Sequence, residues 1–469
     1  MGEAGTPLAD MLGLAEWGPR QLVTAINARL SSQGRERLRL DPTAGYSWVR
    51  RGFRPRTPIP DVAAAVLTER LGYLVTVAQL WPGRQQPGIP ARSAASGLEG
   101  AVGIDGLIHE LSRLGETAVT PQSPIADATG ADLTAAVLDQ LRGAVVAARD
   151  RAGREYVLPE QVDLISAHVA ALRRLDDRHG GGALSLRYVT AELRSVIDLV
   201  EYASYDRHTG KRLLTIVADL GQLLGWLSFD SSRYGAAERY LLLSVGVCRA
   251  LGTGDRAANA IGMLSYVSAF AGHGPEAVRI AEAAACECGA GDPVLRARLL
   301  GREATAAAAD GDLARFRRQS QAAAVLLQRH TASDPPSFLY YLTPEQLAAE
   351  AGQALVVLAE RTTASRRRLL SEAVETLSGA VTAMAAPGPS AYPRSALLHT
   401  TFLARACLLR GDLDEAVTAM RSGLGLLGQV QSPRARGYLH GLRSAMGRRS
   451  RSEVVREFLD EFDEASSHV

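Results

Sequence analysis

Apolar residues recur at helical spacing over most of this chain. In residues 20–30 they gather on one face of a helix. From about residue 184 to the end, one amphipathic segment follows another, as in residues 213–227 and 398–410. Residues spaced three and four apart share a helix face, so this pattern predicts an all-α protein.

The second half of the chain also contains a repeat. Each copy has an apolar helix followed by a second helix that opens on a short turn, and Gly-Asp-Leu begins two of these turns, at residues 311 and 411. Alanine, or phenylalanine in one copy, recurs where the two helices would cross, at spacings of 40, 39, 57 and 43 residues. The equivalent positions are Ala237, Ala277, Phe316, Ala373 and Ala416. This pattern predicts helical hairpins of the tetratricopeptide (TPR) kind, stacked as an α-solenoid. A generic helical bundle is the alternative.

Composition divides the chain into four parts. Residues 1–84 form an arginine-rich domain, and residues 85–130 are expected to be a linker that is rich in Pro, Gly, Ser and Gln near its start. Residues 131–183 are expected to be a helical connecting region. Residues 184–469 hold the repeats and an acidic C-terminal helix, which would cap the solenoid.

Residues 41–83 resemble the back half of a λ-repressor/Xre-type helix-turn-helix domain. Asp41 followed by Pro42 is a typical helix start, with an N-cap and a proline in the first turn. We expect the recognition helix to run from Pro42 to Arg51. Gly52 follows directly, and we expect it to end this helix as a left-handed C-cap.

The same resemblance implies helices on both sides of the recognition helix. Residues 61–71 and 76–80 would be the fourth and fifth helices, with Gly72 between them, and residues 20–30 would be the first. The second helix of the family would fall in residues 31–40. That stretch is short and arginine-rich, so we expect a degenerate second helix.

An Xre-like domain joined to TPR-like repeats in an arginine-rich chain resembles the actinobacterial regulators that repress sporulation and antibiotic production in streptomycetes. It is also similar in plan to the peptide-sensing regulators of Gram-positive bacteria. The resemblance implies a transcriptional or developmental regulator that binds DNA through its N-terminal domain. It also implies that the repeats sense a peptide or small molecule and mediate dimerisation. The alternative is a TPR adaptor whose N-terminal domain does not bind DNA specifically.

The charge distribution favours DNA as a partner of the N-terminal domain. The whole chain has a net charge of +2, yet eight arginines lie between residues 29 and 56 against only Glu36 and Asp41. Such a local surplus binds phosphates through the release of counterions, and arginine also reads guanine edges. The residues expected to contact DNA are Thr43, Tyr46, Ser47, Arg50, Arg51, Arg54 and Arg56. The alternative is a solvated basic face. Trp48, Phe53 and Trp81 are expected to fill the core of the domain.

In a TPR protein, the first helix of each hairpin lines the concave face. The repeat register therefore predicts a ligand groove lined by Gln222, Trp226, Asn259, Tyr266 and Arg405. Amide groups there would bind a peptide backbone, and arginine would bind a carboxylate. For Trp226 and Tyr266, the alternative is packing between repeats.

Motifs for catalysis are missing from the sequence. It contains no HExxH, P-loop, GxSxG or kinase signature. Cys286 and Cys288 are two residues apart, so they would point away from each other on a helix. No signal peptide is apparent, and no run of about 18 apolar residues suggests a membrane span. We therefore expect a cytoplasmic DNA-binding protein without enzyme activity, cofactor or metal. It is expected to be a homodimer, because helix-turn-helix proteins read two half-sites.

Overall fold

In the computed structural model, the described residues form helices and no β-strands. The structure describes residues 6–32, 36–56, 58–71, 75, 77–81, 103–118, 128, 131–146, 148–289, 291–330, 335–363, 365–386, 392–449 and 452–467. Within these ranges, β pairing is limited to isolated bridges, Arg151 with Tyr205 and Tyr156 with Ser204. The predicted all-α class is confirmed.

The chain divides into two compact units. The first comprises residues 1–90, 411–424 and 435–469, and the second comprises residues 91–410 and 425–434. The N-terminal helices of the first unit are α1 (Pro7–Ala15), α2 (Pro19–Ser32), the 3-10 turn η1 (Glu36–Leu38), α3 (Ala44–Arg51), α4 (Ile59–Leu71) and α5 (Val77–Leu80). The C-terminal helices are α19 (Leu413–Leu426), α20 (Pro433–Gly447) and α21 (Glu453–Ser467).

A compact apolar core holds α1–α5 together. Trp48 and Trp81 meet edge to face, with ring centroids 6.4 Å apart, and the Trp81 indole nitrogen donates to the Phe53 carbonyl at 3.1 Å. Both tryptophans are buried, as predicted. The prediction for Phe53 is wrong, because its side chain is 51% exposed. Gly52 takes a left-handed conformation (φ 62°) that ends α3, so the chain turns at this point and only the backbone of Phe53 reaches the core.

The helix predicted from Pro42 to Arg51 begins later than expected. The Asp41 carboxylate accepts a hydrogen bond from the Thr43 backbone nitrogen at 2.7 Å, which makes a turn ahead of the helix. Therefore α3 starts at Ala44, with Thr43 in the N-cap position. Gly52 is the left-handed C-cap, as predicted. Gly72 and Thr76, which were expected to flank the last helix of this domain, lie outside the described residues.

Helix α1 was not predicted, and it changes the order of the helices. The predicted first helix is α2, the second helix of the domain, and residues 36–38 form only a 3-10 turn. Contact between α2 and α3 depends on Gly45, because a Cβ there would lie 2.6 Å from the Pro19 carbonyl oxygen. The Thr6 hydroxyl caps α1 and donates to the Val49 carbonyl at 2.7 Å. These contacts hold α3 against both preceding helices.

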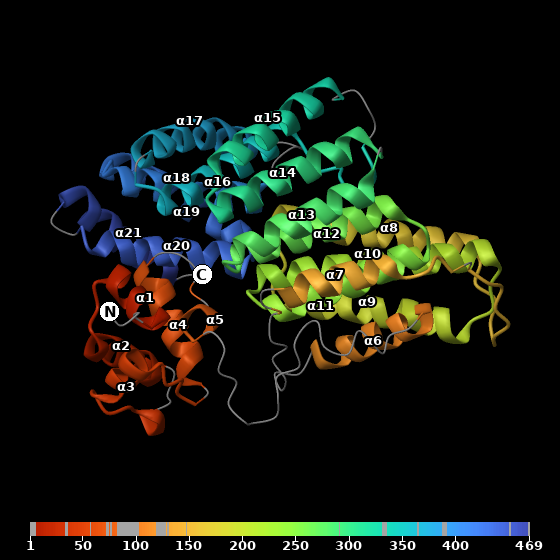
Figure 1. Ribbon diagram of the computed structural model, residues 1–469, viewed down its shortest axis with the longest axis horizontal. Coiled ribbons are helices and arrows are strands. Elements are labelled where there is room, and N and C mark those ends of the chain that lie inside the picture. The colour runs from red at the N-terminus through yellow and green to blue at the C-terminus, as the bar shows by residue number, and fades with distance from the viewer. Residues whose placement is uncertain are drawn as a thin grey trace. The chain divides into compact units, whose positions relative to one another are not determined.

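The second unit is a succession of helices (Figure 1). They are α6 (Gly103–Ala118), α7 (Ala131–Arg142), α8 (Pro159–His179), α9 (Ala183–Tyr202), α10 (Arg207–Asp230), α11 (Tyr234–Ala250), α12 (Gly254–Phe270), α13 (Gly274–Cys288), α14 (Pro293–Asp310), α15 (Leu313–Arg329), α16 (Pro344–Arg361), α17 (Arg366–Ala385), α18 (Pro393–Arg410) and the 3-10 turn η2 (Leu427–Gln429). Capping side chains fix several helix starts, among them Asp206, Asp292, Asp312 and Thr343.

Helices α10 to α17 pack as consecutive pairs, α10 with α11, α12 with α13, α14 with α15 and α16 with α17. Short connections make each pair antiparallel. The first helices of successive pairs also touch, from α10 through α12, α14 and α16 to α18. The positions that the repeat pattern equated are all buried, and Ala237, Ala277 and Phe316 are each the fourth residue of the second helix of a pair. Gly225 permits the close approach of α10 and α11, because a Cβ there would lie 2.7 Å from Leu241 Cγ.

The middle of the chain differs from the prediction, and the expected linker is wrong. The expected linker, residues 85–130, contains α6, whose buried face includes Leu107 and Leu111. The helical connecting region expected over residues 131–183 is not continuous, because α7 ends at Arg142, before Gly143, and α8 begins at Pro159. Beyond α7, the Val146 nitrogen donates to the Ala250 carbonyl at 2.7 Å. The segment after α7 therefore pairs a backbone group with the end of α11 instead of continuing α7.

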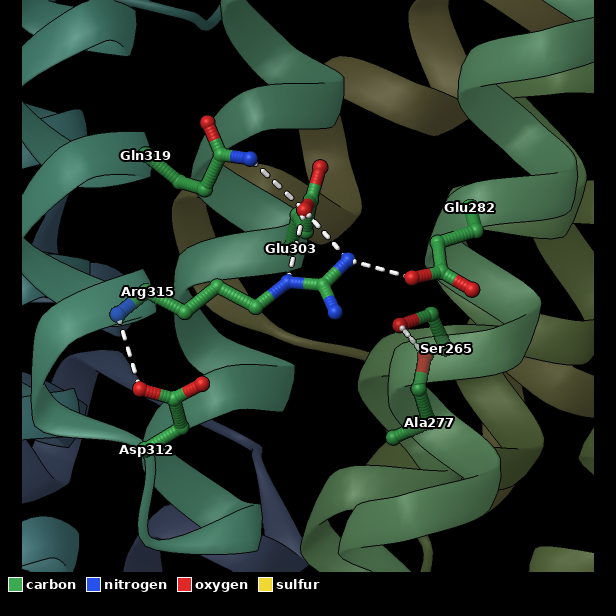
Figure 2. Close-up of polar contacts among 7 residues, drawn as sticks. All are labelled: Ser265, Ala277, Glu282, Glu303, Asp312, Arg315 and Gln319. Carbon is green, nitrogen blue, oxygen red and sulfur yellow. Dashed lines mark hydrogen bonds and ion pairs between the residues drawn. The ribbon is translucent and has the colours of Figure 1, made fainter.

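A polar cluster joins three successive helices (Figure 2). Arg315 of α15 donates to Glu303 of α14 at 2.6 Å and to Glu282 of α13 at 2.7 Å. Gln319 adds a bond to Glu303 at 2.7 Å, and Asp312 caps α15 by accepting from the Arg315 backbone nitrogen at 2.9 Å. This cluster ties one helical pair to the next.

Helix α10 is long and apolar enough, by length and composition, to cross a membrane. However, 78% of its most apolar 18-residue window is buried inside the protein. Its apolar character is accounted for by packing against α8, α9 and α11.

Candidate functional site

Helix α3 presents most of the predicted DNA-contacting residues on one exposed face. Tyr46, Ser47, Arg50 and Arg51 are exposed, while Trp48 on the opposite side is buried in the core. The Arg50 guanidinium lies 5.7 Å from the centroid of the Tyr46 ring, which orients it along this face. The structure therefore brings these four residues together.

The remaining predicted contacts lie at the two ends of α3. Thr43 is exposed, but its hydroxyl donates to the Asp41 carboxylate. That hydrogen bond lowers the pKa of Asp41 below its usual value. Arg54 is half-buried and Arg56 is exposed, both in the segment after Gly52. Of these residues, Thr43 is the one whose side chain is already engaged within the domain.

The arginines of α3 and of the segment after it share one electrostatic feature. Arg50, Arg51, Arg54 and Arg56 form no ion pair with any described residue, whereas Arg29 pairs with Glu69. A guanidinium without a carboxylate neighbour retains its full attraction for phosphate. The exposed Phe53 ring lies directly after this face in the chain. Sequence reasoning assigned it to the core, and no sequence signal marked it as exposed.

A second candidate site is a cavity of about 70 Å³ in the second unit. Residues from α8, α10, α12, α14, α16 and the start of α18 line it, together with aromatic residues from the segment before α16. Polar and charged lining residues include Arg173, Asp176, Asp177, Gln222, Asn259, Arg302, Gln346, Glu350 and Arg394. The first helices of the consecutive pairs therefore contribute to a common cavity.

Three of the five predicted groove residues line this cavity, namely Gln222, Trp226 and Asn259. Tyr266 is 3% exposed and packs 5.9 Å from Trp226, so packing between helices describes it better. Arg405 is outside the lining and donates to Glu360 at 2.7 Å. Arg405 lies in the C-terminal half of α18, whereas the α18 residues that line the cavity lie at its N-terminal end. This position explains why Arg405 is not part of the lining.

Trp226 lies at the centre of a group of arginines. The guanidinium groups of Arg302, Arg394 and Arg434 lie 5.7, 5.5 and 5.7 Å from its ring. Arg302 also lies 4.1 Å from the centroid of the Tyr266 ring. Aromatic faces stabilise these cations where water is excluded.

Buried carboxylates hold the arginines in place. Asp230 accepts hydrogen bonds from Arg394 and Ser432, both at 2.9 Å, and lies 3.7 Å from Arg434. Its partners come from distant parts of the chain. The arrangement fixes the start of α18 and the segment after η2 against the end of α10.

Glu350 is the second buried anchor. It accepts from Arg298 at 2.5 Å and lies 3.6 Å from Arg302, and Gln346 donates to its other oxygen at 2.9 Å. Burial alone would raise the pKa of Glu350, but the two arginines lower it to about 2. Glu350 is therefore ionised.

Asp176 and Asp177 stand side by side at the end of α8. Asp177 accepts a hydrogen bond from the Tyr340 hydroxyl, and burial raises its pKa. Burial also raises the pKa of Asp176, to about 7. Asp176 Oδ1 has no hydrogen-bond partner among the described residues. The cavity thus contains one carboxyl group that is not committed to a neighbour.

Sequence reasoning missed Asp176, Arg302 and Arg394. The available signal was a charged residue on an otherwise apolar helix face, as at Arg302 in the alanine-rich α14. Such a residue is buried only with partners. Those partners come from elsewhere in the chain, so the helical pattern by itself does not identify them.

Comparison with known proteins is informative for the N-terminal domain. Residues 8–80 match the family model of the SP15 N-terminal domain. The match extends over nearly all of α1–α5, including the unpredicted α1. No curated protein matches the chain.

Proposed function

We propose that this protein is a DNA-binding transcriptional regulator whose second unit senses a ligand. The N-terminal domain would act as a helix-turn-helix variant, with α3 as the recognition helix and α2 as its supporting helix. The paired helices of the second unit would be TPR-like repeats, and the protein would act as a homodimer. The exposed arginine face of α3 carries this proposal.

Three features of α3 support a role at DNA. Its inner side is fixed by the buried Trp48 and by the close packing at Gly45, so its outer side is rigid. Arg50 and Arg51 on that outer side have no acidic partner among the described residues. A helix with exposed guanidinium and hydroxyl groups can bind phosphates and reach base edges.

Fluorescence anisotropy of the full chain on genomic duplex fragments, repeated over a salt series, tests the proposal. The double variant Arg50→Glu, Arg54→Glu should weaken binding at least tenfold and flatten the salt dependence, because each lost phosphate contact removes a slope of about 0.9. Arg367 and Arg368 on α17 are exposed and provide the control. Arg367→Glu, Arg368→Glu makes the same charge change and should bind as the wild type does. Equal binding by both double variants would refute the role of α3.

The second candidate function is a protein adaptor. Large apolar side chains are exposed on α8 and α9, including Leu164 at 72%, Leu184 at 76% and Tyr188 at 54%. Exposed apolar side chains of this size favour contact with another protein. DNA binding that is weak, blind to sequence and unaffected by the α3 variants would favour the adaptor.

A further inference from the structure

The cavity in the second unit contains both donors and acceptors without partners. Arg302 Nη1 and Arg394 Nε have no hydrogen-bond partner among the described residues, and the same holds for Asp176 Oδ1. All three residues line the cavity, and none is more than 5% exposed. A buried polar atom without a partner costs the folded state its full desolvation. The cavity is therefore suited to a ligand that offers both an acceptor and a donor.

The unused arginine donors favour a ligand with an anionic group. Four buried guanidinium groups and three buried carboxyl groups gather here: Arg298, Arg302, Arg394, Arg434, Asp176, Asp230 and Glu350. Glu350 accepts its short hydrogen bond from Arg298, and Asp230 Oδ1 accepts from Arg394 Nη2. Arg302 Nη1 lies 3.6 Å from Glu350, beyond hydrogen-bond distance, so Arg302 Nη1 and Arg394 Nε each keep an unused donor. A ligand carboxylate would complete them.

The size and the remaining acceptor narrow the class of ligand. A cavity of about 70 Å³ is roughly half the ~150 Å³ that accommodates benzene in an engineered protein cavity, so it has room for a head group of a few heavy atoms. A simple carboxylate would leave Asp176 without a partner, and a simple amine would leave both arginines without one. A phosphate dianion would be repelled by Asp177 and Glu350, which also line the cavity.

We propose that this cavity binds the head group of a free α-amino acid. The ligand carboxylate bonds to Arg302 and Arg394, its ammonium group bonds to Asp176, and Trp226 forms the wall between the charged residues. This inference rests on the proposed function, because it names the ligand that the second unit would sense. Glycine is the smallest α-amino acid and tests recognition of the head group alone.

Isothermal titration calorimetry of the full chain at pH 8 provides the test. Glycine, acetate and methylammonium are titrated separately at one ionic strength. Glycine should bind in a saturable manner and at least tenfold more tightly than acetate or methylammonium, because only glycine completes both sets of groups. Absence of saturable glycine binding would overturn the proposal. Equal affinities for glycine and acetate would also overturn it, since they would indicate a site for a simple anion.

Variants assign each half of the ligand to its residue. Asp176→Asn should weaken glycine at least tenfold and leave acetate unchanged. Arg302→Lys should weaken both ligands, and Arg394→Lys repeats this test at an independent position if the first variant does not fold. Asp198 is an exposed carboxylate on α9, so Asp198→Asn is the matched control and should bind like the wild type. Asp176→Asn binding glycine as tightly as the control does would rule out the assigned ammonium site.

This test separates failure of the inference from failure of the proposed function. The calorimetry contains no DNA, and the α3 variants are measured without amino acid. Glycine binding without DNA binding would leave an amino-acid-binding protein whose regulatory role is refuted. DNA binding without glycine binding would leave a regulator whose cavity has another use.

Discussion

At the end of α8, the Asp176 carboxyl group is 4% exposed, and its pKa is raised to about 7. Burial is the main cause, Asp177 and Asp230 add to it, and the positive charges of Arg394 and Arg434 oppose it. In the unfolded chain the pKa of this group would lie near the ordinary aspartate value of 3.8. Between these two values the folded protein holds a proton that the unfolded chain has released.

That proton difference predicts a dependence of stability on pH. As pH rises from about 4 to about 7, titration of Asp176 should lower the free energy of unfolding by up to ~1.4 kcal/mol per pH unit, because the unfolded state binds fewer protons. Above pH 7 the loss is complete. Asp176→Asn removes this titration, so urea denaturation should show a flatter pH dependence for the variant and a more stable variant at pH 8. Asp198→Asn should follow the wild type, and parallel curves for Asp176→Asn and the wild type would contradict the assignment.

At the scale of helices, Arg315 links α15 to α13 and α14 (Figure 2). Its main partner, Glu303, has a side chain that is 8% exposed, so removing the guanidinium leaves a buried carboxylate with only Gln319 as a donor. Arg315→Met should therefore destabilise the protein by about 1–3 kcal/mol, the cost of an unsatisfied buried group. Chemical denaturation monitored by circular dichroism measures the change.

Two further variants isolate the ion pair in this cluster. Glu303→Met combined with Arg315→Met removes both charges, so the double variant should recover most of the loss. Arg318 is exposed on the same helix, and Arg318→Met should change stability by less than about 0.5 kcal/mol. A double variant no more stable than Arg315→Met alone would mean that side-chain packing, and not charge, explains the effect.

The helical elements were predictable where the apolar pattern was continuous. Helix α2 and the end of α3 at Gly52 follow directly from apolar spacing and from the need for a left-handed cap. Helix α1 is only nine residues long, and α6 lies within a segment that is rich in Pro and Gly near its start. Short or isolated helices give little periodic signal.

The same distinction applies to the cavity. Gln222, Trp226 and Asn259 were predicted because the repeat register places them on the first helix of a pair. Arg394 was not, because it is buried through Asp230, 164 residues away in the chain. Helical periodicity reports which face of a helix is apolar, and it contains no information on which distant charge will compensate a buried one.

Across the whole molecule, arginine serves two different environments. It accounts for all but one of the 52 basic residues, yet the net charge is only +2. On α3 the guanidinium groups are mostly exposed and without acidic partners, while around Trp226 they are buried with aspartate, glutamate and aromatic neighbours. Arginine remains charged in both settings. Under the two proposals, the first unit would bind phosphate and the second a carboxylate.

If the two sites belong to one regulator, their binding must be coupled. A ligand that changes DNA affinity by some factor must have its own affinity changed by DNA by the same factor, because the binding steps form a thermodynamic cycle. We expect saturating glycine to change the DNA affinity of the full chain by at least about fivefold, the lower end of typical allosteric coupling. Anisotropy with and without glycine, and calorimetry with and without DNA, measure the two factors.

The factor by which glycine changes DNA affinity and the factor by which DNA changes glycine affinity must agree, so each measurement checks the other. Asp176→Asn should abolish the effect of glycine on DNA binding at concentrations that saturate the wild type, because the variant no longer binds the ammonium group. Unequal factors would mean that glycine acts on DNA binding through a site other than the cavity. A wild-type DNA affinity that does not change on saturation with glycine would show that the two sites act independently. The cavity would then bind its ligand for a purpose unrelated to DNA.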